Sequence, residues 1–69
     1  MSKNPILRYF AYEHLTRESL RETSRLFHDL AHGLDSRLPD GPEKSVALRK
    51  LLESKDAAVR ATLDVEESH

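Results

Sequence analysis

The sequence predicts an all-α fold, an antiparallel two-helix hairpin preceded by a short N-terminal arm. Two stretches with apolar residues at helical spacing flank a short segment that contains two prolines and a glycine. The chain has only 69 residues, of which 38% are hydrophobic, and no cysteine, so a single copy can bury little apolar surface and has no disulfide to offset this. We therefore expect the hairpin to complete its core as a homo-oligomer.

Residues 1–15 are predicted to form the arm, either irregular or with a short helical turn. They are rich in apolar residues without a sustained helical period, and they hold every aromatic residue except Phe27. Rings outside the two long helices can fold back over exposed apolar surface or stack on a nucleobase. Both uses are compatible if Phe10 points inward and Tyr12 outward.

The first helix is predicted to run from about Arg17 to Ser36. Thr16 is placed to cap its free N–H groups, and Glu18 lies favourably in the first turn, near the positive end of the helix dipole. The apolar residues that follow recur at helical spacing, namely Leu20, Phe27, Leu30, Ala31 and Leu34. This spacing is typical of a helix that packs one face against a partner.

A tight turn is predicted at Leu38-Pro39-Asp40-Gly41-Pro42, because the prolines and the glycine prevent the helix from continuing. Asp40 followed by Glu43 has the form of a capping box, and Pro42 suits a first helical turn. The second helix should therefore begin near Pro42 and reach about Leu63. In this division the hairpin occupies residues 16–64, and residues 65–69 form a frayed polar tail.

The second helix carries two adjacent apolar stripes. One contains Leu48, Leu52, Val59 and Leu63, and the other contains Ala47, Leu51, Ala58 and Ala61. One partner helix cannot cover both, so we expect an uncovered apolar strip on this helix, where the small residues Ala57, Ala58 and Ala61 allow another helix to approach closely. Sister molecules are the expected cover, in an assembly larger than a dimer.

The charge balance and hydropathy exclude several classes of protein. Eleven Lys and Arg residues against twelve Asp and Glu residues argue against a protein that binds DNA or RNA polymers. No apolar run is long enough for a membrane span, and the first residues do not form a secretory signal, so we expect a cytoplasmic protein with no membrane partner.

A metal site and a catalytic site are both unsupported by the residue pattern. His28 and His32 lie four residues apart, as in the zinc protease pattern HExxH, but Asp29 replaces the glutamate and no third ligand is evident. The chain also lacks a P-loop glycine pattern and any spacing that indicates a Ser/His/Asp arrangement. We expect no metal, no cofactor and no enzymatic activity.

Basic residues give two candidate anion sites. Arg17, Arg21 and Arg25 repeat every four residues and form a ridge that could hold phosphates bidentately. The alternative is an ordinary solvated face, with ion pairs Glu18–Arg21, Glu22–Arg25 and Arg25–Asp29. Lys44 and Ser45 open the second helix, where free N–H groups attract anions.

The motifs of the chain resemble those of a known family. The arm with Phe10-Ala11-Tyr12, a first helix with a Leu-Ala stretch, Pro39 and the run 43–53 (EKSVALRKLLE) are similar to the phage anti-CBASS cyclic-nucleotide sponges. The same helical hairpin occurs in the related anti-Thoeris sponges. The similarity spans about residues 10 to 61, and its most specific part is the pattern E-K-S-x-A-x-x-K-L.

The resemblance implies a homo-oligomer, typically a hexamer, that sequesters signalling nucleotides of bacterial immune systems without cleaving them. Its ligands would be cyclic dinucleotides held between protomers and cyclic trinucleotides in separate pockets. Tyr12 would stack on a base, and Arg25, with Arg21 next, would meet the phosphates. The full candidate ligand-binding set is Phe10, Tyr12, Arg21, Arg25, Lys44 and Ser45. The alternative function is a small helical protein–protein interaction module with no nucleotide ligand.

Overall fold

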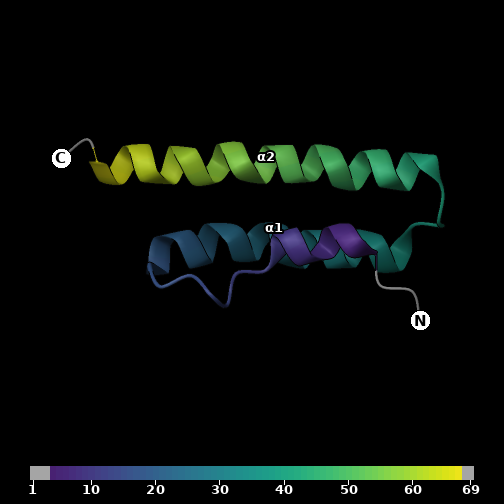
Figure 1. Ribbon diagram of the computed structural model, residues 1–69, viewed down its shortest axis with the longest axis horizontal. Helices are drawn as coiled ribbons and strands as arrows, with labels where there is room; N and C mark the ends of the chain where they lie inside the picture. Colours follow the sequence, from purple (N-terminus) through teal and green to yellow (C-terminus); the bar gives the residue numbers. More distant parts are fainter. Residues whose placement is uncertain (1–3, 68–69) are drawn as a thin grey trace.

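The computed structural model of the chain describes residues 4–67 and contains a hairpin of two long helices. A short 3-10 helix, η1 (Pro5–Phe10), is followed by α1 (Glu18–Arg37) and α2 (Pro42–Glu67). The two long helices lie side by side and run in opposite directions, with η1 alongside α1 (Figure 1). The predicted all-α hairpin with a short arm is therefore confirmed.

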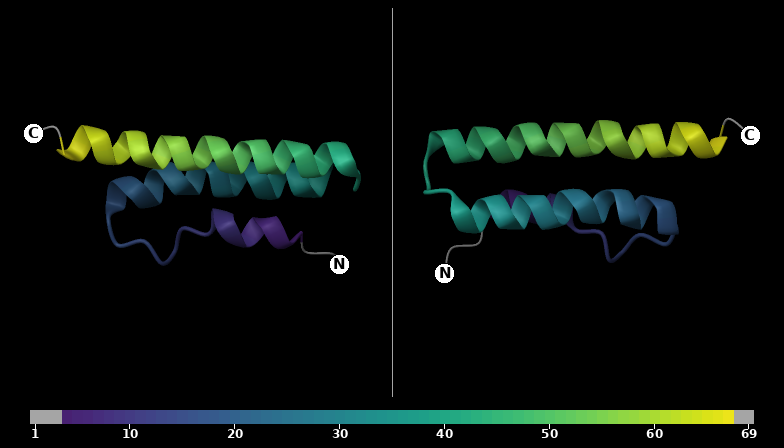
Figure 2. Two further views of the ribbon diagram at one scale, coloured as in Figure 1. Left: turned by 45° about the horizontal axis from the view of Figure 1, so that its top comes forward. Right: turned by 180° about the vertical axis from the view of Figure 1, so that it is seen from behind.

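The arm is more ordered than an irregular segment. Asn4 caps η1, because its side-chain Oδ1 accepts a hydrogen bond from the backbone N–H of Ile6 at 3.3 Å, and Pro5 occupies the first turn. The segment then continues as extended chain and turns back to the start of α1, as the two further views in Figure 2 show. In the prediction, the short helical turn was one of two options, and it is the one observed.

The start of α1 differs from the prediction by one residue. Arg17, rather than Thr16, occupies the N-cap position, and its side chain makes no capping hydrogen bond. The proposed cap by Thr16 is therefore wrong. Glu18 does lie in the first turn, where a carboxylate is favourable, and Arg37 lies in the last turn.

The turn places Pro42 at the first position of α2, as predicted. Gly41 precedes it with a φ of 157°, a backbone angle that favours glycine. Asp40 therefore lies one residue too early for the capping box, and its carboxylate instead accepts a hydrogen bond from Lys44. The helix also continues to Glu67, past the expected end at Leu63, and residues 68–69 of the expected frayed tail lie outside the described residues.

The core is small and takes one fully buried apolar residue from each element. Phe10 of η1, Ala31 of α1 and Leu48 of α2 are each 0% exposed. Half-buried residues pack around them, namely Ile6, Leu7, Phe27, Leu34, Leu51 and Leu52. The arm therefore supplies the largest fully buried side chain of the core and covers part of the surface that two helices alone would leave exposed.

The uncovered apolar surface does not lie where the sequence indicated. Most of the two α2 stripes is at least half-buried, although Ala61 of the second stripe and the neighbouring Ala57 are exposed. The large exposed apolar side chains belong instead to the arm and to α1, namely Tyr9 (52% exposed), Leu26 (72%) and Leu30 (51%). The expected strip on the second helix is thus corrected to one on the outer face of α1.

None of the helices in the described range 4–67 is both long and apolar enough to span a membrane.

Candidate functional site

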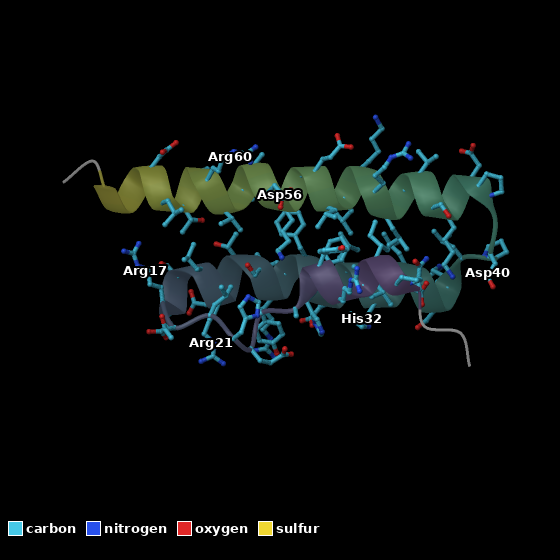
Figure 3. All side chains as sticks on the ribbon, viewed as in Figure 1. Arg17, Arg21, His32, Asp40, Asp56 and Arg60 are labelled. Carbon is cyan, nitrogen blue, oxygen red and sulfur yellow. The ribbon has the colours of Figure 1, made fainter. Side chains whose placement is uncertain are left out.

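Three of the predicted ligand-binding residues line one pocket. This pocket, of about 220 Å³, lies between the arm and the first half of α1, and it is lined by Tyr12, Glu18, Arg21, Glu22 and Arg25. Arg21 and Arg25 are one helical turn apart on α1, and Arg21 extends from the side of α1 that faces away from α2 (Figure 3). The arm thus places an aromatic ring beside two guanidinium groups, as the sequence predicted.

Ring contacts hold Tyr12 against α1. Its half-buried ring meets the ring of His28 edge-on, with centroids 5.0 Å apart and planes at 73°. The ring of His28 in turn lies 4.3 Å from that of His32, and its Nδ1 is 3.0 Å from a carboxylate oxygen of Asp29. Tyr12 thus packs against His28, and His28 in turn contacts His32.

The charges around the Tyr12 pocket are mixed. Arg25 makes an ion pair with Asp29 at 3.7 Å, and both side chains are more than 60% exposed. This is one of the three pairs that the solvated-face alternative expects. An exposed pair of this kind contributes less than about 1 kcal/mol, so Arg25 can exchange it for a phosphate at small cost. Glu18 and Glu22 lower the net positive charge and offer acceptors for N–H and O–H groups.

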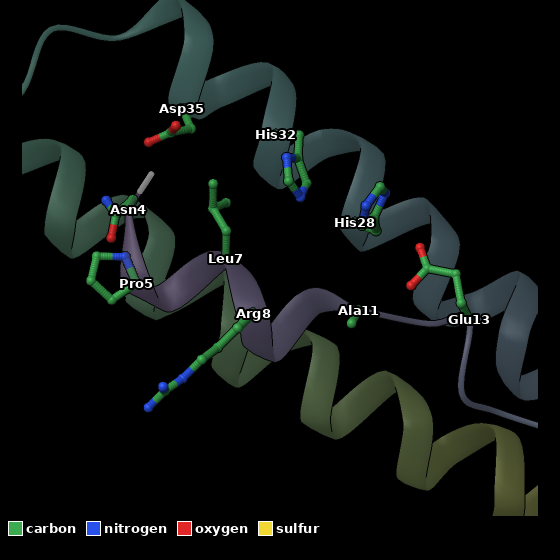
Figure 4. A pocket seen from close by; sticks show the side chains of 9 residues that line it. All are labelled: Asn4, Pro5, Leu7, Arg8, Ala11, Glu13, His28, His32 and Asp35. Atoms are coloured by element: carbon green, nitrogen blue, oxygen red, sulfur yellow. The ribbon is translucent and has the colours of Figure 1, made fainter. Parts of the chain in front are cut away.

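A second, larger pocket separates the arm from the second half of α1. It measures about 470 Å³ and is lined by Asn4, Pro5, Leu7, Arg8, Ala11, Glu13, His28, His32 and Asp35. Figure 4 shows both imidazoles on the α1 side and Leu7 reaching toward them from η1. Among the described residues, no three His, Cys, Asp or Glu side chains are close enough to hold a metal ion. Sequence reasoning missed this pocket because its walls come from an arm with no periodic pattern.

Lys44 is a buried clamp at the turn between the helices. Its side chain is 7% exposed, and its ammonium group donates to the backbone carbonyl of Asp35 at 2.7 Å and to Asp40 Oδ1 at 2.9 Å. It also lies 3.0 Å from Asp35 Oδ1. The hydrogen bonds to Asp40 and then Asp35 raise the pKa of Lys44 above its ordinary value, in spite of burial. All three donors of the ammonium are engaged within the chain.

Ser45 lies beside this clamp and is exposed. It lines a hollow of about 290 Å³ together with Asn4, Pro5, Asp35, Asp40, Gly41 and Lys44. The two carboxylates make this hollow a poor match for a phosphate. Arg21 and Asp35 are separated by about 21 Å along α1, at 1.5 Å per residue, so Lys44 and Ser45 do not join the Tyr12 pocket within one chain.

Phe10, the sixth candidate, is fully buried and presents no ring face to a ligand in this chain. It packs in the core, and the ammonium of Lys55 lies 5.9 Å from its ring centroid. The same ammonium donates a hydrogen bond to the backbone carbonyl of Tyr9, which ties the arm to α2. Burial lowers the pKa of Lys55, and the charge of Asp56 opposes this effect.

The open end of the hairpin is held by polar contacts. Thr62 donates its hydroxyl to the carbonyl of Ala58 at 3.0 Å, so Thr23 is the donor in the 3.0 Å bond between the two threonine hydroxyls. Ser24 nearby is 0% exposed, and its hydroxyl oxygen makes no hydrogen bond within the described part of the chain. The fully buried apolar residues Phe10, Ala31 and Leu48 lie outside this region.

Comparison of the chain with protein-family models, with curated proteins and with solved structures found no match in any of the three.

Proposed function

We propose that the chain is a non-enzymatic sponge that binds cyclic oligonucleotide signals and blocks CBASS-type bacterial defence on behalf of a phage. The observation that carries this proposal is the pocket in which Tyr12 lies beside Arg21 and Arg25. The resemblance of the motifs at residues 10–12 and 43–53 supports it from the sequence. The expected ligands are cyclic dinucleotides and, in separate pockets, cyclic trinucleotides, in the host cytoplasm.

The pocket matches the two chemical features of a nucleotide. A tyrosine ring stacks on a base, which contributes about 1–3 kcal/mol per base. Guanidinium groups bind phosphate oxygens bidentately, and Arg25 can leave its exposed pair with Asp29 to do so. Glu18 and Glu22 can accept hydrogen bonds from base amino groups or from a ribose hydroxyl.

The size of the pocket supports a homo-oligomer. Its volume of about 220 Å³ is below the range of about 300–1,000 Å³ that encloses a complete small ligand. One pocket therefore accommodates one base and its adjoining phosphate, and a second copy of the chain would enclose the rest. A sponge needs no more than tight binding, and about 12 kcal/mol of binding free energy corresponds to nanomolar capture.

Incubation with a panel of cyclic nucleotides tests the function. The protein is mixed with cyclic dinucleotides, cyclic trinucleotides and a cyclic ADP-ribose, separated from unbound ligand, denatured by heat and analysed by chromatography. We expect depletion of at least one cyclic oligonucleotide and its intact recovery after heating. Converted product would show an enzyme, and no depletion of any ligand would favour the protein–protein interaction module.

A pair of tyrosine variants tests the site. Tyr12→Ala should weaken cyclic dinucleotide binding at least about tenfold, because it removes the stacking ring. Tyr9→Ala is the matched control, since Tyr9 is an exposed arm tyrosine outside the pocket. Calorimetry measures both affinities, and equal affinities for the two variants would remove Tyr12 from the site.

A further inference from the structure

The outer face of α1 carries a continuous exposed stripe. Its members are Glu22, Leu26, Leu30, Gly33 and Arg37, and all five are exposed. At 100° per residue they fall within about 80° of arc, so they form one line along the helix of about 22 Å. Leu26 and Leu30 are two of the large exposed apolar side chains among the described residues. Neither η1 nor α2, the other elements in the described range, covers this stripe.

Gly33 has no evident function inside the hairpin. A Cβ added at this position would meet nothing within 4 Å, and Gly33 does not adopt a positive φ. A glycine inside a helix costs about 1 kcal/mol relative to alanine, so the residue is unfavourable for the isolated chain. It does leave a notch in the exposed surface, which lets another helix approach closely.

We propose that this stripe is a docking surface for a second copy of the chain, with the two α1 helices antiparallel. In one register, Leu26 fits the notch at Gly33 of the partner subunit, and Glu22 faces Arg37 of the partner subunit. The twofold axis repeats both contacts and brings the two Leu30 side chains together at the centre. The stripe is therefore complementary to itself in shape and in charge, as an isologous interface requires.

The neighbouring charges are compatible with this register. Asp29 lies beside the stripe close to the twofold axis, where two copies of it would repel each other. Arg25 pairs with Asp29 at 3.7 Å in each copy and offsets that repulsion. The proposal makes specific the self-association included in the proposed function, and it does not depend on a nucleotide. Assemblies larger than a dimer need a further contact.

Charge reversal tests the register. Glu22→Arg and Arg37→Glu should each raise the dimer dissociation constant about tenfold or more, because each places like charges opposite each other twice. The double variant restores opposite charges and should return the constant to within about threefold of wild type. Sedimentation equilibrium without nucleotide measures these constants, with Arg49→Glu, an exposed position on α2, as the control. If the double variant dimerises as weakly as the single variants, the proposed register is wrong.

Variants of the notch and the leucine test the surface itself. Gly33→Leu and Leu26→Gln should both weaken the dimer at least about tenfold, while helical circular dichroism stays at the wild-type level because both positions are exposed. Tyr12→Ala should leave the dimer intact. If the wild-type chain is monomeric up to millimolar concentration, the docking proposal is wrong, whereas a dimer that binds no cyclic nucleotide contradicts only the proposed function.

Discussion

The two ends of the hairpin are built differently. The turn end contains the fully buried Leu48 and the buried Lys44, whose ammonium group is held by two aspartates. The open end has a hydrogen-bonded threonine pair and the pocket of Tyr12, Arg21 and Arg25. It also contains a buried serine hydroxyl that has no hydrogen-bond partner among residues 4–67. The comparison indicates that the buried core and the Lys44 contacts lie toward the turn, whereas the candidate pocket lies toward the other end.

Phe10→Ala should give the largest loss of stability, because it removes the largest fully buried side chain of the core, which packs the arm against the hairpin. Truncation of a buried phenylalanine costs about 3–5 kcal/mol, which is comparable to the whole stability of a chain this short. We expect the helical circular dichroism signal at 25 °C to fall markedly. Tyr9→Ala, the exposed neighbour, should change the free energy of unfolding by less than about 1 kcal/mol. A folded Phe10→Ala protein with wild-type melting temperature would contradict the assignment of Phe10 to the core.

The Lys44 clamp should make stability depend on alkaline pH. Since hydrogen bonds to Asp40 and Asp35 raise the folded-state pKa above 10.5, the clamp stabilises the fold below that pH and is lost as the pH rises through the raised value. We therefore expect the melting temperatures of Lys44→Met and wild type, measured between about pH 9 and pH 11.5, to become equal at the alkaline end of this range. Lys50→Met, at an exposed position, is the control, and its melting temperature should differ from that of wild type by a constant amount over this pH range. If the melting temperatures of Lys44→Met and wild type differ by the same amount at every pH, the charge of Lys44 contributes nothing to stability.

Arg25→Ala should affect binding without affecting the fold. Loss of one guanidinium from the pocket should weaken cyclic dinucleotide binding about tenfold, which is about 1.4 kcal/mol. The melting temperature should stay close to wild type, because the exposed pair with Asp29 contributes little. Arg49→Ala is the matched control in calorimetry. If both variants bind equally well, the phosphate contact lies elsewhere.

Ser24→Ala should give the smallest effect and the opposite sign. The buried hydroxyl has no hydrogen-bond partner in the part of the chain that the structure describes, and the helical position favours alanine, so its removal should stabilise the chain by about 0.5–1 kcal/mol. Urea denaturation measures this difference, with Ser36→Ala, an exposed serine on the same helix, as the comparison. A destabilised Ser24→Ala protein would mean that the hydroxyl has a partner after all.

Helical spacing and turn residues predicted the helices accurately, but they predicted the exposed surfaces less accurately. The proline-rich turn set the start of α2 at Pro42, and helical spacing located α1 to within a residue at each end. The position of Tyr12 near Arg21 and Arg25 was also predicted, because an aromatic arm directly precedes the helix that carries the arginines. The burial of Lys44 between Asp35 and Asp40 was not predicted, since Asp40 was assigned to a capping box.

The position of the exposed apolar surface could not be predicted from helical spacing. Which stripe stays uncovered depends on where the arm lies, and the arm has no periodic pattern to orient it. Phe10 fills the groove beside Ala31 and Leu48, and the outer face of α1 with Leu26 and Leu30 is left open. A contact between segments distant in sequence thus decides the surface, whereas the helices follow from their own residues.

Calorimetric titration of the purified chain with a cyclic dinucleotide tests the proposed function most directly. The expected result is saturable binding with a dissociation constant in the nanomolar range, recovery of the intact ligand after heating, and loss of at least about tenfold in affinity for Tyr12→Ala but not for Tyr9→Ala. Absence of binding to any cyclic nucleotide, by a protein shown to be folded, would contradict the assignment of the Tyr12 pocket as a nucleotide site.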